Sequence, residues 1–227
     1  MEIFMEEQVN KNYRYERKYI LPKNQFTLTI QSLLNKNFYE VYNSRRINNI
    51  YLDTYHFNSV TENLEGLSNR KKTRVRWYGN SFDMSLKTIE VKIKNEFLNR
   101  KEKLDLGRFK INNFSSINSD IKFLKDEILV KNISFYNEIV DTIPTLYNSY
   151  ERLYFYNPIE NIRITIDNDL FFYSPITKSK YYEKELIIEA KFEKKTFFLN
   201  NFQNLNLTRY SKYVKGILKT SFSKTFY

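Results

Sequence analysis

Charged and apolar residues alternate along several short segments of the chain, and most of the charged residues are basic. The clearest segments are 74–77, 90–94, 163–167 and 189–191. Side chains of a strand point alternately to its two faces, so each segment predicts a strand with one charged face and one apolar face. If these strands share a sheet, their charged faces can form one surface rich in Lys and Arg with a few carboxylates.

The same alternation is also typical of an antiparallel sheet that packs one face and leaves the other in water. Two details favour converging charged faces. Lys and Arg recur on strand after strand, and an apolar residue, Ile187, precedes Glu189 on the side that would be wet. The pattern alone leaves both interpretations open.

The pattern of the whole chain predicts an α+β fold that is mainly β. The predicted strands are 13–21, 46–53, 72–78, 88–94, 100–106, 145–156, 161–167 and 186–193. Helices are predicted after Pro22 and over 57–63, 119–140 and 210–223, and Gly66 is expected to end the second helix with a positive φ. Eight strands with helices outside favour a closed antiparallel barrel, because closure leaves no edge strand exposed.

The length and composition indicate one domain over residues 1–227. The chain has no internal repeat, no low-complexity linker and no sharp shift in composition. Hydrophobic residues make up 41% of it, with 19 Tyr and 19 Phe to build a core.

The net charge restricts the classes of partner. Lys and Arg total 37 against 26 Asp and Glu, a formal charge of +11, which favours anions such as nucleotides, polyphosphate, nucleic acid or an acidic membrane surface. The acidic residues that interleave the basic sets, and the lack of a recognition motif, argue against nucleic acid. With no Cys and only His56, disulfides and a Cys/His zinc site are excluded.

The first ten residues carry Glu2, Glu6 and Glu7 without a long apolar run, so no signal peptide is expected there. No stretch approaches the roughly 20 apolar residues of a membrane span. We therefore expect a cytoplasmic protein, with peripheral attachment through its positive charge left open.

A set of motifs in chain order carries a resemblance to a known family. The motifs are YRYERKY at 13–19, YLDT at 51–54, ENLEGLS at 62–68, KTRVRWYG at 72–79, EVKIK at 90–94, YER at 150–152, RITID at 163–167, EAK at 189–191 and SKY at 211–213. Together they resemble the VTC domain, the polyphosphate polymerase branch of the triphosphate tunnel metalloenzymes, over nearly the whole chain.

The resemblance implies an eight-stranded antiparallel tunnel with its polar face inward, in which basic side chains hold ATP or a phosphate chain. Motif by motif, it implies catalytic roles for Lys18, Arg74, Arg76, Lys92, Arg152 and Arg163, and substrate binding by Lys101, Arg209, Ser211 and Lys212. The register of the hairpin after residue 95 leaves Lys101 and Lys103 as alternatives.

The resemblance also implies that Glu189 binds Mn²⁺ or Mg²⁺. By alternation Glu16 and Glu90 point into the same space, so either could assist, and Glu16 is our second metal ligand. A hard divalent ion needs only one or two carboxylates because it keeps several waters. The alternative role for Glu189 is an ion pair with a neighbouring lysine.

The function implied is transfer of the terminal phosphoryl group of ATP to a growing polyphosphate chain. Hydrolysis of triphosphate or short polyphosphate would use the same groups with water as acceptor, and a binding module without catalysis is a third possibility. The chain lacks the extra domains of larger family members, so a membrane channel for the product would be a separate membrane-protein partner.

Overall fold

The computed structural model describes residues 15–95, 99–193 and 206–221. Tyr13 and Arg14 of the first motif, residues 96–98 of the predicted hairpin turn and the last two residues of the predicted helix 210–223 lie outside the described residues.

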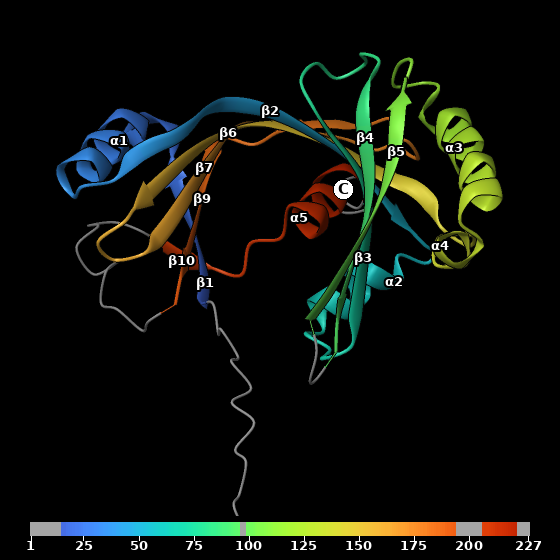
Figure 1. The fold of residues 1–227 in the computed structure, drawn as a ribbon, viewed down its shortest axis with the longest axis horizontal. Coiled ribbons are helices and arrows are strands. Elements are labelled where there is room, and N and C mark those ends of the chain that lie inside the picture. Colours follow the sequence, from blue (N-terminus) through green and yellow to red (C-terminus); the bar gives the residue numbers. More distant parts are fainter. Residues whose placement is uncertain (1–14, 96–98, 194–205, 222–227) are drawn as a thin grey trace, which may run out of the picture.

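The strands form one antiparallel sheet that is bent into an arch (Figure 1). The strand order is β10-β1-β9-β7-β6-β2-β3-β4-β5, and β8 pairs with β7 outside this path. The strands are β1 (Tyr15–Pro22), β2 (Tyr39–Asp53), β3 (Arg70–Tyr78), β4 (Ser85–Lys94), β5 (Asn99–Phe109), β6 (Ile143–Asn157), β7 (Ile162–Tyr173), β8 (Lys180–Tyr182), β9 (Glu185–Phe192) and β10 (Asn206–Thr208).

The prediction of a closed eight-stranded barrel is wrong, because the sheet has ten strands and is open. Closure would require β5, at one end of the order, to pair with β1. The free side of β1 is taken by β10 instead, with Lys18 opposite Thr208 and Ile20 opposite Asn206. Within the described residues β5 and β10 are therefore the two edges of the sheet.

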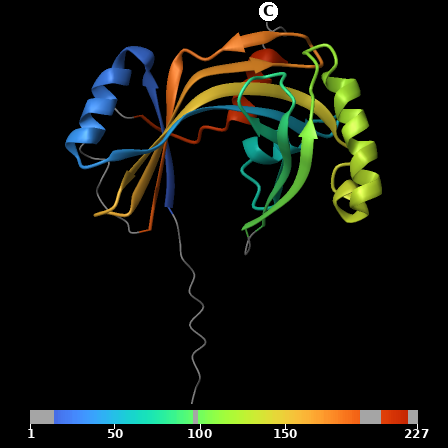
Figure 2. The same ribbon diagram turned by 45° about the horizontal axis from the view of Figure 1, so that its top comes forward.

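The arch comes from two long central strands. β2 and β6 pair with each other, and their register shifts between Glu40 and Tyr42 and between Tyr42 and Arg45. Such irregularities bend a strand and increase its twist. Figure 2 shows the two halves of the sheet standing on either side of this bend.

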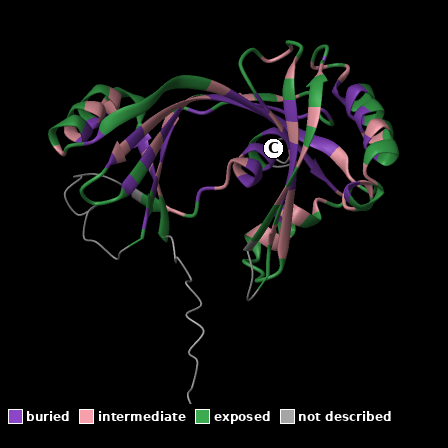
Figure 3. Ribbon diagram, in the orientation of Figure 1, coloured by how far each residue is buried: buried purple, intermediate pink, exposed green. Residues whose placement is uncertain are grey.

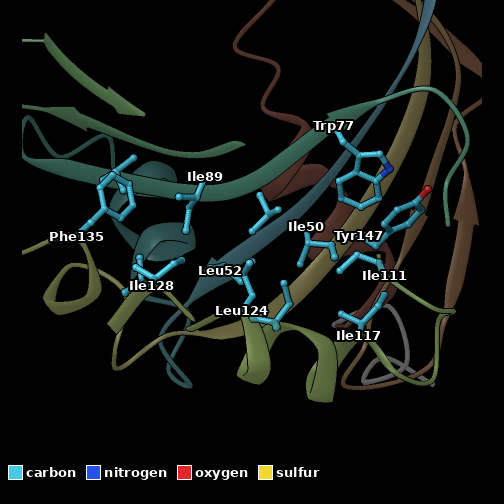
Figure 4. Packing of buried hydrophobic residues seen from close by; sticks show 14 of the residues in the cluster. Ile50, Leu52, Trp77, Ile89, Ile111, Ile117, Leu124, Ile128, Phe135 and Tyr147 are labelled. Carbon is cyan, nitrogen blue, oxygen red and sulfur yellow. The ribbon is translucent and has the colours of Figure 1, made fainter. Parts of the chain in front are cut away.

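Helices cover the outer face of each half. α1 (Phe26–Asn35) follows a short 3-10 helix (Lys23–Gln25) and packs its buried Leu33 in a cluster with residues of β1, β6, β7 and β9. α3 (Ile117–Lys131) and α4 (Ile133–Asn137) pack over β2 to β5, where Trp77 is fully buried (Figure 4). The apolar residues of the alternating segments thus face outward, under the helices.

A third cluster lies on the inner side of the arch. α5 (Lys212–Thr220) packs there against Leu146, Phe172 and Ile187, and α2 (Asn58–Leu64) joins it through Val60. Figure 1 shows α5 beneath the bend of the sheet. The apolar Ile187 on an otherwise charged strand face is explained by this helix.

Two of the predicted helices can be compared in detail. Gly66 follows α2 with a φ of 70°, as expected. The predicted helix 119–140 is broken at Asn132, whose backbone is extended and whose side chain accepts a hydrogen bond from the Phe135 N–H at 2.9 Å. Among the described residues, no helix has the length and apolar character needed to cross a membrane.

Candidate active site

The charged residues of the alternating segments gather on the sheet face opposite α1 and α3, which we call the inner face. Cross-strand pairs define it: Arg74 of β3 lies opposite Glu90 of β4, which lies opposite Lys103 of β5. Their sequence neighbours Val75 and Ile89 are fully buried in the outer cluster with α3. Figure 3 shows how burial changes along these strands.

Glu90 is the centre of the first charge cluster on this face. Arg74 donates to Glu90 Oε2 from Nε at 2.8 Å and from Nη2 at 2.6 Å, and Arg76 Nη1 lies 3.8 Å from the same oxygen. Lys101 and Lys103 reach Glu90 Oε1 at 2.8 and 3.9 Å, so both of the alternative lysines lie on the inner face. Burial would raise the pKa of Glu90, but Arg74, Lys101 and Arg76 lower it to about 2.

A row of lysines crosses the same half of the sheet. Lys72 of β3 lies opposite Lys92 of β4, which lies opposite Lys101 of β5. Lys72 Nζ donates to Ser211 Oγ at 3.0 Å. Burial, and then repulsion from Lys18 and other nearby cations, lowers the pKa of Lys72 to about 8. The row therefore forms a strongly positive strip.

A second cluster lies where β6, β7 and α5 meet. Arg152 donates to the buried Asp167 in a forked pair, at 2.5 Å from Nε and 2.8 Å from Nη2, and Lys212 forms an ion pair with the same carboxylate. Burial would raise the pKa of Asp167, and Lys212 and Arg152 lower it to about 2. The ring of the buried Tyr150 lies under both cations, at 5.3 Å from Arg152 Cζ and 4.7 Å from Lys212 Nζ.

The third cluster joins β1 and β9. Lys18 Nζ lies 3.1 Å from Glu16 Oε1 and 3.7 Å from Glu189 Oε2, and Lys191 Nζ lies 3.6 Å from Glu16 Oε2 and 2.9 Å from Glu189 Oε1. Burial would raise the pKa of Glu189, but Lys18 and Lys191 lower it to about 2.

Electrostatic interactions connect the three clusters across the arch. The charge of Lys18 on β1 lowers the pKa of Lys72 on β3, and the charge of Glu189 on β9 raises that of Arg152 on β6. Tyr150 interacts with both Arg76 and Arg152. The three clusters are therefore close enough for their charges to act on one another.

A family model for the VTC domain matches residues 13–221. The chain belongs to the VTC domain family. No curated protein matches the sequence. Among solved structures, the fold is similar to a "putative adenylate cyclase" from Vibrio parahaemolyticus, with 12% identity over 83% of this chain and 80% of that chain and a TM-score of 0.40. That TM-score is too low to support an argument, so family membership rests on the match to the VTC domain.

Most of the residues that the VTC resemblance selects lie in these clusters. They are Lys18, Arg74, Arg76, Lys92, Lys101, Arg152, Ser211 and Lys212, together with Glu16 and Glu189. Two others form no ion pair in these clusters. Arg163 is exposed, lies opposite Lys191 on the neighbouring strand and rests over the ring of Tyr156 at 6.0 Å, and Arg209 is exposed between β10 and α5.

The VTC domain's two candidate metal ligands suit a hard divalent ion. Glu16 and Glu189 share Lys18 and Lys191 as partners, so their carboxylates lie on one patch. Mg²⁺ is usually bound by one or two carboxylates together with substrate phosphates and water. Among the described residues, no group of three or more acidic or His side chains gathers that would hold a metal by itself. The residues therefore fit an ion that binds together with phosphate.

Sequence reasoning missed several residues of this site. Asp167 anchors Arg152 and Lys212, Tyr150 lies beneath them, and Asn49 Oδ1 accepts from Arg76 Nε at 2.8 Å. Lys72 lies within the matched motif without a role of its own. For Tyr150, Asp167 and Lys72 the signal in the sequence was position, because each lies two or four residues from a selected residue of its own strand, whereas Asn49 lies on a strand without a selected residue.

Proposed function

We propose that this VTC domain is a metal-dependent polyphosphate polymerase, which transfers the terminal phosphoryl group of ATP to a growing polyphosphate chain. The observation that carries the proposal is the clustering of Arg74, Arg76 and Arg152 on one inner face that also holds Glu189. Phosphoryl transfer needs little covalent help from a protein, and it depends on positioning and charge neutralisation.

The arginines are arranged to hold phosphate oxygens in pairs. Arg152 already donates one hydrogen bond to each oxygen of a carboxylate, which is the forked geometry that a phosphate group also accepts, and Arg74 donates two hydrogen bonds to one carboxylate oxygen. Their positions are fixed by Glu90 and Asp167, so little order remains to be imposed when a triphosphate binds. Lys18, Lys72 and Lys212 add point charges around them.

Glu189 and Glu16 are the residues that would hold Mn²⁺ or Mg²⁺. The ion would supply neutralisation of the charge on the phosphate oxygens. Lys18 and Lys191, which form ion pairs with the two carboxylates, would supply further positive charge for the phosphates.

The test is incubation of the purified chain with ATP and Mn²⁺, with long polyphosphate measured on a gel and free phosphate measured in solution. The proposal predicts long polyphosphate and ADP in wild type and neither in Glu189→Gln. Free phosphate without polyphosphate would overturn the polymerase in favour of a hydrolase. Binding of ATP without turnover would overturn both in favour of a binding module.

The proposal includes ATP and polyphosphate as the partners and the cytoplasm as the location, with any export of product left to a separate membrane protein. It does not include nucleic acid, because carboxylates interleave the cations of the inner face. Duplex DNA that bound as tightly as tripolyphosphate at the same salt concentration would contradict this.

A further inference from the structure

Exposed or partly exposed tyrosines and arginines cover a part of the inner face that the phosphate clusters do not use. They lie on the first half of β2, on the last part of β6 and at the start of β7. We call this surface the tyrosine–arginine platform, and its members are Tyr39, Tyr42, Arg45, Tyr154, Tyr156 and Arg163.

The platform is built from cross-strand contacts. Tyr42 and Tyr154 lie opposite each other with ring centroids 5.7 Å apart and rings nearly perpendicular, and Tyr39 and Tyr156 repeat this arrangement at 6.0 Å. The guanidinium of Arg45 lies over both rings of the first pair, at 5.1 and 5.8 Å. Neighbouring side chains hold these rings in place, so a ligand that stacks on them would not have to order them first.

Packing among the described residues does not account for these side chains. Tyr39 and Tyr42 are 47% and 55% exposed, whereas Phe155, which points to the other face between Tyr154 and Tyr156, is buried in the cluster with α1. The two arginines, Arg45 and Arg163, are exposed as well, and neither forms an ion pair with a carboxylate of the described residues. The platform thus presents aromatic rings and uncompensated positive charge together.

The platform is continuous with the proposed phosphate site. Arg152, Tyr154 and Tyr156 follow one another on the same face of β6, and same-face neighbours on a strand are about 7 Å apart. A triphosphate held by Arg152 and Lys212 therefore has the tyrosines beside one of its ends.

A polyphosphate chain has no group that needs aromatic rings, whereas a nucleobase stacks on them and on arginine planes. We propose that the tyrosine–arginine platform binds the base of the nucleoside triphosphate donor and so distinguishes ATP from a phosphate chain. The inference rests on the proposed function for the identity of the donor, and it adds the residues that recognise the donor's base.

The test compares two ligands on one double variant, Tyr42→Ala with Tyr154→Ala. Titration calorimetry without divalent metal, which prevents turnover, measures the Kd of ATP and of inorganic tripolyphosphate. Loss of stacking should raise the Kd of ATP by roughly 5-fold to 100-fold. The Kd of tripolyphosphate should stay within about 2-fold of wild type, because its contacts lie at the arginines.

Tyr55→Ala is the matched control, since Tyr55 is 75% exposed outside the platform. It should change neither Kd. An equal change in Kd for both ligands in the double variant, or an unchanged Kd of ATP, would overturn the inference. The melting temperature of the double variant is measured as well, and an unchanged value excludes unfolding as the cause of weaker binding. A variant that loses binding of single-stranded oligonucleotide but keeps that of ATP would assign the platform to nucleic acid instead.

This result is separable from that of the proposed function. Absence of polyphosphate in the wild-type assay would refute the polymerase, while selective loss of ATP binding in the double variant would still support a base-binding platform. Polyphosphate synthesis with no selective loss would refute only the platform.

Discussion

Arg74 and Glu90 lie opposite each other on neighbouring strands, and one carboxylate oxygen of Glu90 accepts two hydrogen bonds from Arg74. Only 6% of the Glu90 side chain is exposed, so the carboxylate depends on its cations for solvation. The pair shows how the inner face holds an arginine in place, because a buried acid fixes the guanidinium through Nε and Nη2.

Glu90→Gln should destabilise the fold and weaken triphosphate binding. Removing one partner of a buried pair leaves uncompensated charge, which costs about 3 kcal/mol and should lower the melting temperature by roughly 5–10 °C. Because the pKa of Glu90 is lowered to about 2, its contribution is complete above about pH 4.5 and is lost as the pH falls toward 2. The melting temperatures of variant and wild type should differ at pH 7 and should converge as the pH falls to 2.5.

The control for that experiment is Glu102→Gln, which removes an acid of β5 whose partner, Arg100, is 59% exposed. Exposed pairs contribute little, so its melting curve should match that of wild type. If Glu102→Gln lowered the melting temperature as much as Glu90→Gln, a special role for the Arg74–Glu90 pair would be contradicted.

Arg76→Lys keeps the net charge but should lower ATP turnover strongly. Arg76 contacts Asn49 through Nε and lies 3.4 Å from the Tyr150 hydroxyl through Nη2, and one ammonium group cannot make both contacts and also hold phosphate. Loss of one charged hydrogen bond should raise the activation free energy by roughly 1.5–3 kcal/mol, which lowers kcat/KM by about 10-fold to 100-fold. Steady-state kinetics with ATP measures this effect.

Two controls separate this effect from overall basicity. Arg46→Lys makes the same exchange on the opposite face of β2, and Lys122→Glu reverses a charge on the exposed side of α3. Both variants should keep kcat/KM within about 2-fold of the wild-type value. Equal losses of kcat/KM in all three variants would mean that only the total charge of the protein matters.

Lys72→Met should stabilise the protein at neutral pH while weakening tripolyphosphate binding. The pKa of Lys72 is lowered to about 8 by burial and by neighbouring cations, so its charge opposes folding below that pH. The gain in melting temperature should be complete below about pH 8 and should disappear as the pH rises from 8 to 10.5. A variant that is less stable than wild type at pH 7, beside an unchanged exposed control Lys110→Met, would refute this.

Glu189→Gln should keep part of the triphosphate binding and lose turnover. The cations that contact phosphate remain, while the metal ligand is gone. Titrations of a nonhydrolysable ATP analogue should show that Mn²⁺ tightens binding to wild type but not to the variant. Glu185→Gln, on the same strand, should behave as wild type, and full turnover in Glu189→Gln would remove Glu189 from the site.

The sequence predicted which residues share the inner face because strand alternation is a local property. Arg74 and Glu90 were placed on one side of their strands by spacing alone, and the structure pairs them directly. The register of Lys101 and Lys103 mattered less than expected, since residues two apart in a strand face the same way.

The parts that sequence did not predict depend on distant contacts. The short strand β10 occupies the edge that closure of a barrel would need, and nothing in three residues signals such pairing. Asn132 separates α3 from α4 within an otherwise helical pattern, and its side chain caps the first turn of α4. The lowered pKa of Lys72 comes from burial and from repulsion by Lys18, on a strand far away in the sequence.

The most direct measurement is an experimental structure of the protein with Mn²⁺ and a nonhydrolysable ATP analogue. The account predicts the terminal phosphates between Arg74, Arg76 and Arg152 on the inner face, with the ion on Glu189. A triphosphate bound anywhere else, with these arginines still paired only to Glu90 and Asp167, would contradict it.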